Sequence, residues 1–240
     1  MIMKRSITII MFLLISVTLS AQVRKVLIQN SRAIDDPVFN ENLFFLKDFI
    51  NCRISFNDGS VYSAKANISS VAQALVVIGE KGDTVGVSRE RDIIAFSGGG
   101  ITAFKVNGIY HQILSMSVDV SLGKTRRLDI RDRRATGAYG GSTHTSSVDQ
   151  VSYFDSDGVA NLMSLINNEW ASGSIFEMEY EYEEDLFLIS KGKRSVPTKK
   201  NFEKLFPKQK NEIAAFMKEN NVTLSKRDEI IGLFKYLIGE

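Results

Sequence analysis

The tripeptide Gly123-Lys124-Thr125 matches the end of a phosphate-binding loop, in which backbone N–H groups and a lysine surround the phosphates of a nucleotide. The full motif requires a glycine five residues before Gly123, where this chain has Val118. The residues after Thr125 favour a strand, whereas phosphate binding needs the N-terminus of a helix at that point. Gly98-Gly99-Gly100 fails the dinucleotide-binding pattern similarly, because a predicted strand follows it. The sequence therefore predicts neither a nucleotide nor any other cofactor.

Metal-binding patterns are also incomplete. Asp155-Ser156-Asp157-Gly158 resembles part of a calcium loop, but the first and twelfth positions would be Tyr153 and Ser164, which supply no carboxylate. The two aspartates fit the start of a helix equally well. We predict no calcium site.

The chain contains two histidines, His111 and His144, and one cysteine, Cys52. A structural zinc site needs four nitrogen or sulfur ligands and a catalytic one needs three, so this set predicts no zinc site. Cys52 has apolar neighbours, which favours a buried, inert thiol. A single cysteine also excludes an internal disulfide.

His144 lies within the segment Thr143–Ser147, where a base and several hydroxyl groups are neighbours in the sequence. Adjacent residues of an extended chain point in opposite directions, so this clustering is no evidence for a catalytic triad. The Gly-x-Ser-x-Gly motif of many hydrolases is absent. A hydrolase that uses His144 is therefore our second alternative function.

The segment Ile175–Glu183 alternates strictly between apolar or aromatic residues and carboxylates, which predicts a strand with one buried and one wet face. The wet face carries Glu177, Glu179, Glu181 and Glu183. Arginines that could pair with these carboxylates across strands are Arg126, Arg127, Arg131, Arg133 and Arg134. The alternative interpretation is an acidic interaction surface for a basic partner or a divalent cation.

Four aromatic residues are candidates for lining a small-molecule or glycan site in the sheet: Tyr110, Tyr139, Tyr153 and Trp170. Such a binding module is our first alternative function. The same four residues also fit an ordinary hydrophobic core.

The elements that position these residues are mostly strands. The stretch from Leu75 to Val120 consists of β-branched and aromatic runs separated by turn residues, and Asn107-Gly108 is its clearest hairpin turn. Asn57-Asp58-Gly59 predicts another hairpin. The segment Leu43–Ile50 predicts a short helix, and an acidic break at residues 183–185 predicts that a separate strand begins at Leu186.

We predict an α+β fold: a β-rich antiparallel sheet or sandwich-like body, followed by a small helical C-terminal appendage. The body covers residues 22–190 and includes one helix near 158–171. The appendage covers residues 198–240, with Pro207 at the start of one helix and Ser225 near the start of the last. A unit this small rarely holds a core alone, so we expect it to dock on the body or on a partner.

Residues 1–21 have the pattern of a secretory signal peptide: basic Lys4 and Arg5, an apolar run of about 13 residues, and small residues at Ser20-Ala21. An uncleaved N-terminal anchor is the alternative, and no later segment predicts a transmembrane span. Removing these residues takes away two of the 30 basic residues and none of the 28 acidic ones. The neutral remainder gives no case for nucleic-acid binding.

Several short phrases together resemble uncharacterised exported proteins of Bacteroidetes-type bacteria. They are Ser20-Ala21-Gln22, Phe56–Gly59, Gly82-Asp83-Thr84, Gly137-Ala138-Tyr139-Gly140 with its Ser/Thr tail, and Phe202–Pro207. The resemblance implies an envelope location, periplasmic or outer-membrane-associated, and it carries no activity or site residues.

Our leading expectation is an exported, non-enzymatic interaction or structural protein with another envelope protein as its partner. The loop Gly137–Ser147 and the amphipathic terminal helices are the features suited to contact.

Overall fold

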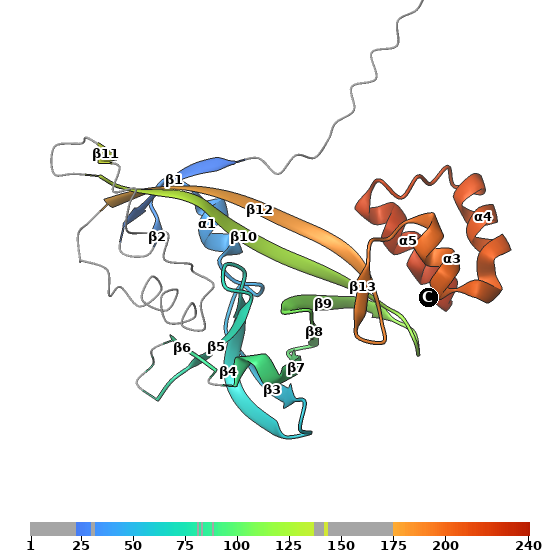
Figure 1. Ribbon diagram of the computed structural model, residues 1–240, viewed down its shortest axis with the longest axis horizontal. Coiled ribbons are helices and arrows are strands. Elements are labelled where there is room, and N and C mark those ends of the chain that lie inside the picture. The colour runs from blue at the N-terminus through green and yellow to red at the C-terminus, as the bar shows by residue number, and fades with distance from the viewer. Residues whose placement is uncertain are drawn as a thin grey trace, which may run out of the picture.

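The computed structural model describes residues 23–29, 32–80, 82, 84–87, 89–136, 142–143 and 175–240 (Figure 1). The predicted signal peptide, the predicted helix near 158–171 and most of the loop Gly137–Ser147 lie outside the described residues. The strands are β1 (Arg24–Gln29), β2 (Arg32–Ala33), β3 (Ile50–Phe56), β4 (Val61–Ser69), β5 (Ala74–Ile78), β6 (Thr84–Gly86), β7 (Ile93–Gly98), β8 (Ile101–Val106), β9 (Ile109–Met116), β10 (Ser121–Thr136), β11 (Ser142–Thr143), β12 (Ile175–Ser190) and β13 (Lys193–Ser195). The helices are α1 (Pro37–Asn42), α3 (Lys199–Leu205), α4 (Lys210–Glu219) and α5 (Arg227–Ile238), with 3₁₀ turns η1 (Glu90–Asp92) and η2 (Pro207–Gln209).

These strands form one antiparallel sheet in the order β2-β1-β12-β10-β9-β8-β7-β3-β4-β5-β6, and β11 and β13 pair with β10 and β12. The α+β, β-rich prediction is confirmed. Both predicted hairpins are present. Asn107 and Gly108 adopt φ of 52° and 77° between β8 and β9, the positive values that a two-residue hairpin turn requires.

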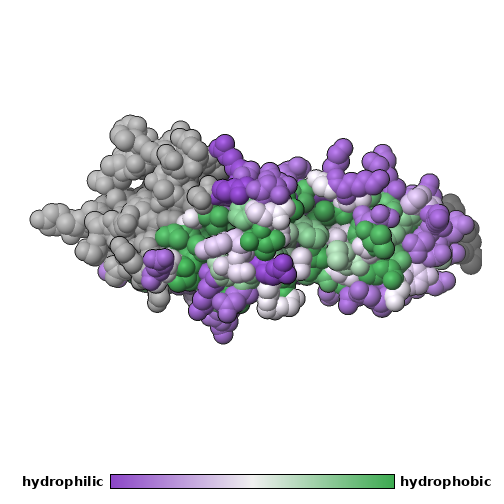
Figure 2. Space-filling view, turned by 90° about the horizontal axis from the view of Figure 1, so that it is seen from below, coloured by the Kyte–Doolittle hydropathy of each residue, from purple (hydrophilic) through white to green (hydrophobic). Residues whose placement is uncertain are grey.

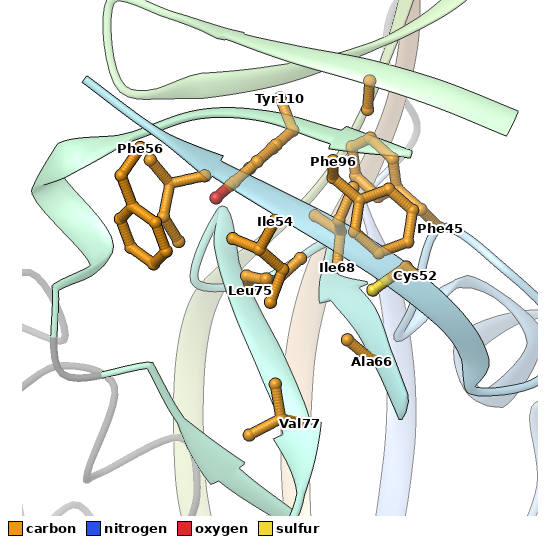
Figure 3. Close-up of a cluster of buried hydrophobic side chains, with 12 residues drawn as sticks. Phe45, Cys52, Ile54, Phe56, Ala66, Ile68, Leu75, Val77, Phe96 and Tyr110 are labelled. Atoms are coloured by element: carbon orange, nitrogen blue, oxygen red, sulfur yellow. The ribbon is translucent and has the colours of Figure 1, made fainter. Parts of the chain in front are cut away.

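The sheet curls back on itself around a first core. The backbone N–H of Leu128 in β10 donates to the carbonyl of Ser70, in the turn after β4, over 3.1 Å. Side chains from β3, β4, β5, β7 and β9 meet inside this curl, as Figure 3 shows. The largest of them that are fully buried are Ile54, Ile68, Leu75, Phe96 and Tyr110.

Strands β10 and β12 form a ribbon of 16 residues each that extends beyond the curled part (Figure 1). One face of this ribbon bears two apolar clusters. Leu128 and Tyr180 pack near α1, whereas Leu122 and Leu188 pack against the C-terminal helices. Between the two clusters lie polar residues, chiefly Lys124, Arg126 and Glu184. Arg126 of β10 is directly opposite Glu184 of β12.

The predicted break at residues 183–185 is wrong, because β12 continues through it. β10 pairs with every residue of that segment, including Asp185 opposite Thr125. Cations on β10 and α5 neutralise Glu184, which removes the main cost of placing this acidic run in a strand.

The predicted helix at Leu43–Ile50 is also wrong, since the helix lies one segment earlier. The Asp36 carboxylate accepts hydrogen bonds from the first-turn N–H groups of α1, and Pro37 occupies its first position. The apolar segment that follows is held as irregular chain beside β4. Asn67 fastens it, because its side-chain amide donates to the carbonyls of Leu46 and Asp48 and its oxygen accepts from Leu46 N–H.

The C-terminal helices dock on the chain's own sheet. Leu233 and Phe234 of α5 and Phe202 of α3 are fully buried against the ribbon residues Leu122 and Leu188. None of the described helices is long and apolar enough to cross a membrane. The helical module, which consists of α3, α4 and α5, thus shares a hydrophobic cluster with one end of the ribbon.

Candidate functional site: a groove beside the C-terminal helices

Of the four predicted ligand-lining aromatics, Tyr110 is the one that lies in the described part of the chain. Tyr110 is fully buried in the first core, while Tyr139, Tyr153 and Trp170 lie outside the described residues. The Tyr110 hydroxyl donates to Glu90 over 2.8 Å, and Lys105 donates to the same carboxylate over 2.6 Å. Tyr110 is thus a core residue whose polar end is satisfied.

The Glu90 network is structural rather than reactive. Burial raises the pKa of Glu90, and the bonds from Lys105 and Tyr110 partly offset this effect. The other carboxylate oxygen accepts the backbone N–H of Leu75, 3.1 Å away. With both oxygens bonded, this carboxylate joins η1 to β5, β8 and β9.

The glutamate row forms cross-strand ion pairs, two of them with the predicted partners Arg127 and Arg131 and the rest with Lys25, which the sequence analysis did not name. Lys25 on β1 lies 3.1 Å from Glu179 and 3.5 Å from Glu177. Arg131 pairs with Glu181, and Arg127 lies 3.5 Å from Glu183. The side chains of Arg133 and Arg134 are outside the described part. The cations of these pairs are exposed and the glutamates are half-buried, so each pair contributes little stability, and the row is a largely neutralised face.

His111 and Cys52 are both buried. His111 Nδ1 lies 2.9 Å from the Ile109 carbonyl, and burial lowers the pKa of the ring to about 4. Gly123, the glycine of the incomplete phosphate-loop pattern, packs against this ring. A Cβ there would lie 3.0 Å from His111 Cβ and 2.7 Å from Ile189 Cδ1. Burial raises the pKa of the Cys52 thiol, as expected for an inert cysteine.

A groove of about 650 Å³ lies where the ribbon meets the C-terminal helices. Its apolar lining comes from β12, the segment before α3, α4 and the start of α5. The lining residues are Glu184, Asp185, Leu186, Val196, Pro197, Thr198, Lys199, Met217, Thr223, Leu224, Ser225, Lys226, Arg227 and Ile230. Figure 2 shows hydrophobic residues gathered in a band along one face of the described surface, with hydrophilic residues at its borders. Among the large hydrophobic residues that the described part exposes, Val196 is the one in this groove.

Glu184 is the electrostatic centre of the groove wall. Its Oε2 lies 2.9 Å from Arg126 Nε and 3.3 Å from Lys124 Nζ, and its Oε1 pairs with Arg227 of α5. The Tyr182 hydroxyl donates to Oε2 over 3.2 Å. One carboxylate thus holds three cations, and it connects the ribbon to the helical module.

The pKa values in this cluster reflect the excess of three cations over one carboxylate. Burial alone would raise the pKa of Glu184, but the surrounding cations outweigh burial and hold the pKa below its ordinary value. Burial lowers the pKa of Lys124, and the nearby Arg126 adds to this, while Glu184 opposes it. Lys124 therefore depends on Glu184 to remain a nearly buried cation.

Sequence reasoning named Arg126 but missed its partner Glu184 and the groove. The sequence feature that could have indicated this cluster is the acidic run at residues 183–185 within a strand pattern. Its meaning depends on Arg227, which lies 43 residues away and is brought close by the docking of α5. No spacing rule in the sequence predicts that contact.

The described residues offer little for other chemistries. His144 lies outside them, and no group of three or more His, Cys, Asp or Glu side chains within them is placed to hold a metal ion. Comparisons of the chain with protein-family models, with curated proteins and with solved structures found no match.

Proposed function

We propose that this chain is a non-enzymatic binding protein of the cell envelope, which holds a segment of a partner protein in the groove between β12 and the C-terminal helices. The groove itself carries the proposal. Its volume of about 650 Å³ lies within the usual range of binding sites, and its lining combines an apolar floor with a few charged groups.

The construction of the groove supports a preformed site. Its walls belong to elements that share one buried cluster, in which Leu188, Phe202, Ile213 and Leu233 are fully enclosed. The Glu184–Arg227 contact ties the start of α5 to the ribbon at the groove wall. A partner would meet walls that are already ordered, which lowers the entropic cost of binding.

A protein segment fits this lining better than a glycan does. None of the lining residues in the described part is aromatic, so the groove lacks the flat apolar faces on which sugar rings stack. Aliphatic residues such as Leu186, Met217 and Ile230 instead suit the side chains of an apolar peptide. The lining includes the hydroxyls of Thr223 and Ser225 but no histidine among the described residues, which ranks a hydrolase below binding.

The envelope location rests on the sequence. The signal-peptide pattern of residues 1–21 and the resemblance to exported bacterial proteins support it. The partner we propose is accordingly another envelope protein.

Site-specific photo-crosslinking in the native host tests the groove. A photo-reactive residue at Val196 is expected to give a discrete protein adduct. The same residue at Val118, which is fully exposed on the β9–β10 turn and outside the groove, is expected not to give it. Identical adducts from both positions, or none from Val196, would count against the groove.

A further inference from the structure

We infer that the groove selects a partner segment in which an acidic side chain accompanies apolar ones. This inference rests on the proposed function and assigns the chemical class of its ligand. It follows from the distribution of charge around the apolar floor.

The negative charge of the lining residue Glu184 is already neutralised by cations of the same chain. Lys124, Arg126 and Arg227 all bond to it, so this cluster carries two positive charges more than negative ones. Asp185 is the other acidic lining residue; it is exposed, and its charge is offset by the lining cations Lys199 and Lys226. Arg227 is the member of this trio that lines the groove, and Lys124 and Arg126 contribute to the local potential through Glu184, so an approaching carboxylate meets a positive wall.

The rim adds to this excess. Lys199 and Lys226 line the groove, and Lys199 has Glu203 at 3.8 Å. Lys226 forms no ion pair within the described residues, although its charge helps to lower the pKa of Glu229. Lys226 is thus the rim cation most available to an incoming carboxylate.

The first turn of α5 adds a weaker attraction. Lys226 is the N-cap of this 12-residue helix and makes no side-chain capping bond. The positive end of the helix dipole therefore meets the groove next to Lys226 and Arg227, although Asp228 and Glu229 of the same turn reduce its field.

Apolar contact and charge lie side by side in this arrangement. Ile230 of the floor is one turn from Lys226 on α5, and Leu224 precedes that helix. A peptide that places an apolar side chain on Ile230 brings the following residues near Lys226 and Arg227. Recognition of acidic motifs by clustered cations beside an apolar anchor is a common mode of peptide binding.

The test uses a phage-displayed library of random 12-residue peptides selected on the purified chain from residue 22. Selected peptides are measured by fluorescence polarisation against four variants. Val196→Arg obstructs the groove, and Val118→Arg is its control at an exposed valine elsewhere. Lys226→Glu reverses the rim charge, and Lys208→Glu makes the same change of net charge on η2, away from the lining.

The expected result is enrichment of peptides with Asp or Glu beside apolar residues. Lys226→Glu is expected to weaken their binding about tenfold, because repulsion replaces attraction between this rim residue and the carboxylate of the peptide. Lys208→Glu and Val118→Arg are expected to leave binding unchanged, while Val196→Arg abolishes it.

Two other results distinguish failure of the acidic preference from failure of the peptide-binding groove. Peptides that bind in a Val196-dependent way, but without acidic enrichment and with unchanged affinity for Lys226→Glu, would overturn the acidic preference and leave the groove intact. Failure to select any peptide whose binding responds to Val196→Arg would overturn both the preference and the peptide-binding groove. Circular dichroism of each variant checks that it is folded.

Discussion

Replacement of Glu184 by glutamine removes the negative charge at the junction of ribbon and helices while preserving the side chain's shape. The carboxylate bonds to Lys124, Arg126 and Arg227 from a side chain that is 19% exposed. Removal of one partner from a fully buried ion pair costs about 3–5 kcal/mol, whereas an exposed pair contributes about 0–1 kcal/mol. Glu184 lies between these limits, and its partner Lys124 is nearly buried, so we expect a loss of about 2–3 kcal/mol.

Urea unfolding at pH 7, followed by circular dichroism, measures this loss. The matched control is Glu183→Gln on the opposite face of β12. Its carboxylate has an ion pair with Arg127 at 3.5 Å and a further attraction to the exposed Arg131, and we expect a change below about 0.5 kcal/mol. Equal effects of the two substitutions, or less than about 0.5 kcal/mol for Glu184→Gln, would refute the reasoning.

The pH dependence gives a second readout of the same cluster. The pKa of Glu184 is lowered in the folded state, so its stabilising contribution is present above its unfolded pKa and is lost as the pH falls through the folded value. The difference between wild type and Glu184→Gln should therefore shrink below about pH 4.5. A difference that stays constant into strong acid would show that charge is not its cause.

Three further predictions concern the core. Burial holds the pKa of His111 at about 4, below the unfolded value, so the neutral ring's contribution is lost as the pH falls from 6.5 towards 4. This contribution is at most about 3 kcal/mol. Urea unfolding at a series of pH values between 4 and 6.5 should show that the free energy of unfolding changes less with pH in His111→Gln than in wild type. Gly123→Ala should cost about 1–3 kcal/mol, because the added Cβ meets Ile189. Gly232→Ala in α5 has open space around the added Cβ and should stabilise the protein by about 0.5–1 kcal/mol. Thermal unfolding of the two variants checks this, and equal shifts in melting temperature would contradict it. Leu233→Ala should cost about 2–5 kcal/mol in the same assay, since the side chain is fully buried between α5 and the ribbon, and a loss below about 1 kcal/mol would show that the helices are loosely packed.

The sequence predicted the parts of the fold whose causes are local. Asn107-Gly108 gave the hairpin between β8 and β9 because the two residues themselves tolerate the backbone angles of that turn. The alternation along β12 gave its buried and wet faces, and Met178 and Tyr180 are indeed enclosed. Periodicity and turn chemistry act over a few residues, so they can be read without the rest of the chain.

The parts that failed depend on distant partners. The segment from Leu43 has the apolar composition of a helix, but Asn67 on β4 supplies the hydrogen bonds that hold it as irregular chain. Glu184 looked like the end of a strand because its three cations come from β10 and α5. The groove likewise exists only after the helices dock, and no pattern in the sequence marks its lining residues as a set.

The most direct test of the groove as a partner site is the affinity of the crosslinked envelope protein, once purified, for the wild-type chain and for Val196→Arg. We predict a loss of at least about tenfold for Val196→Arg, because a charged side chain would occupy the apolar lining, and no change for Val118→Arg. Unchanged affinity of a folded Val196→Arg variant would contradict the account and would place the partner on another surface.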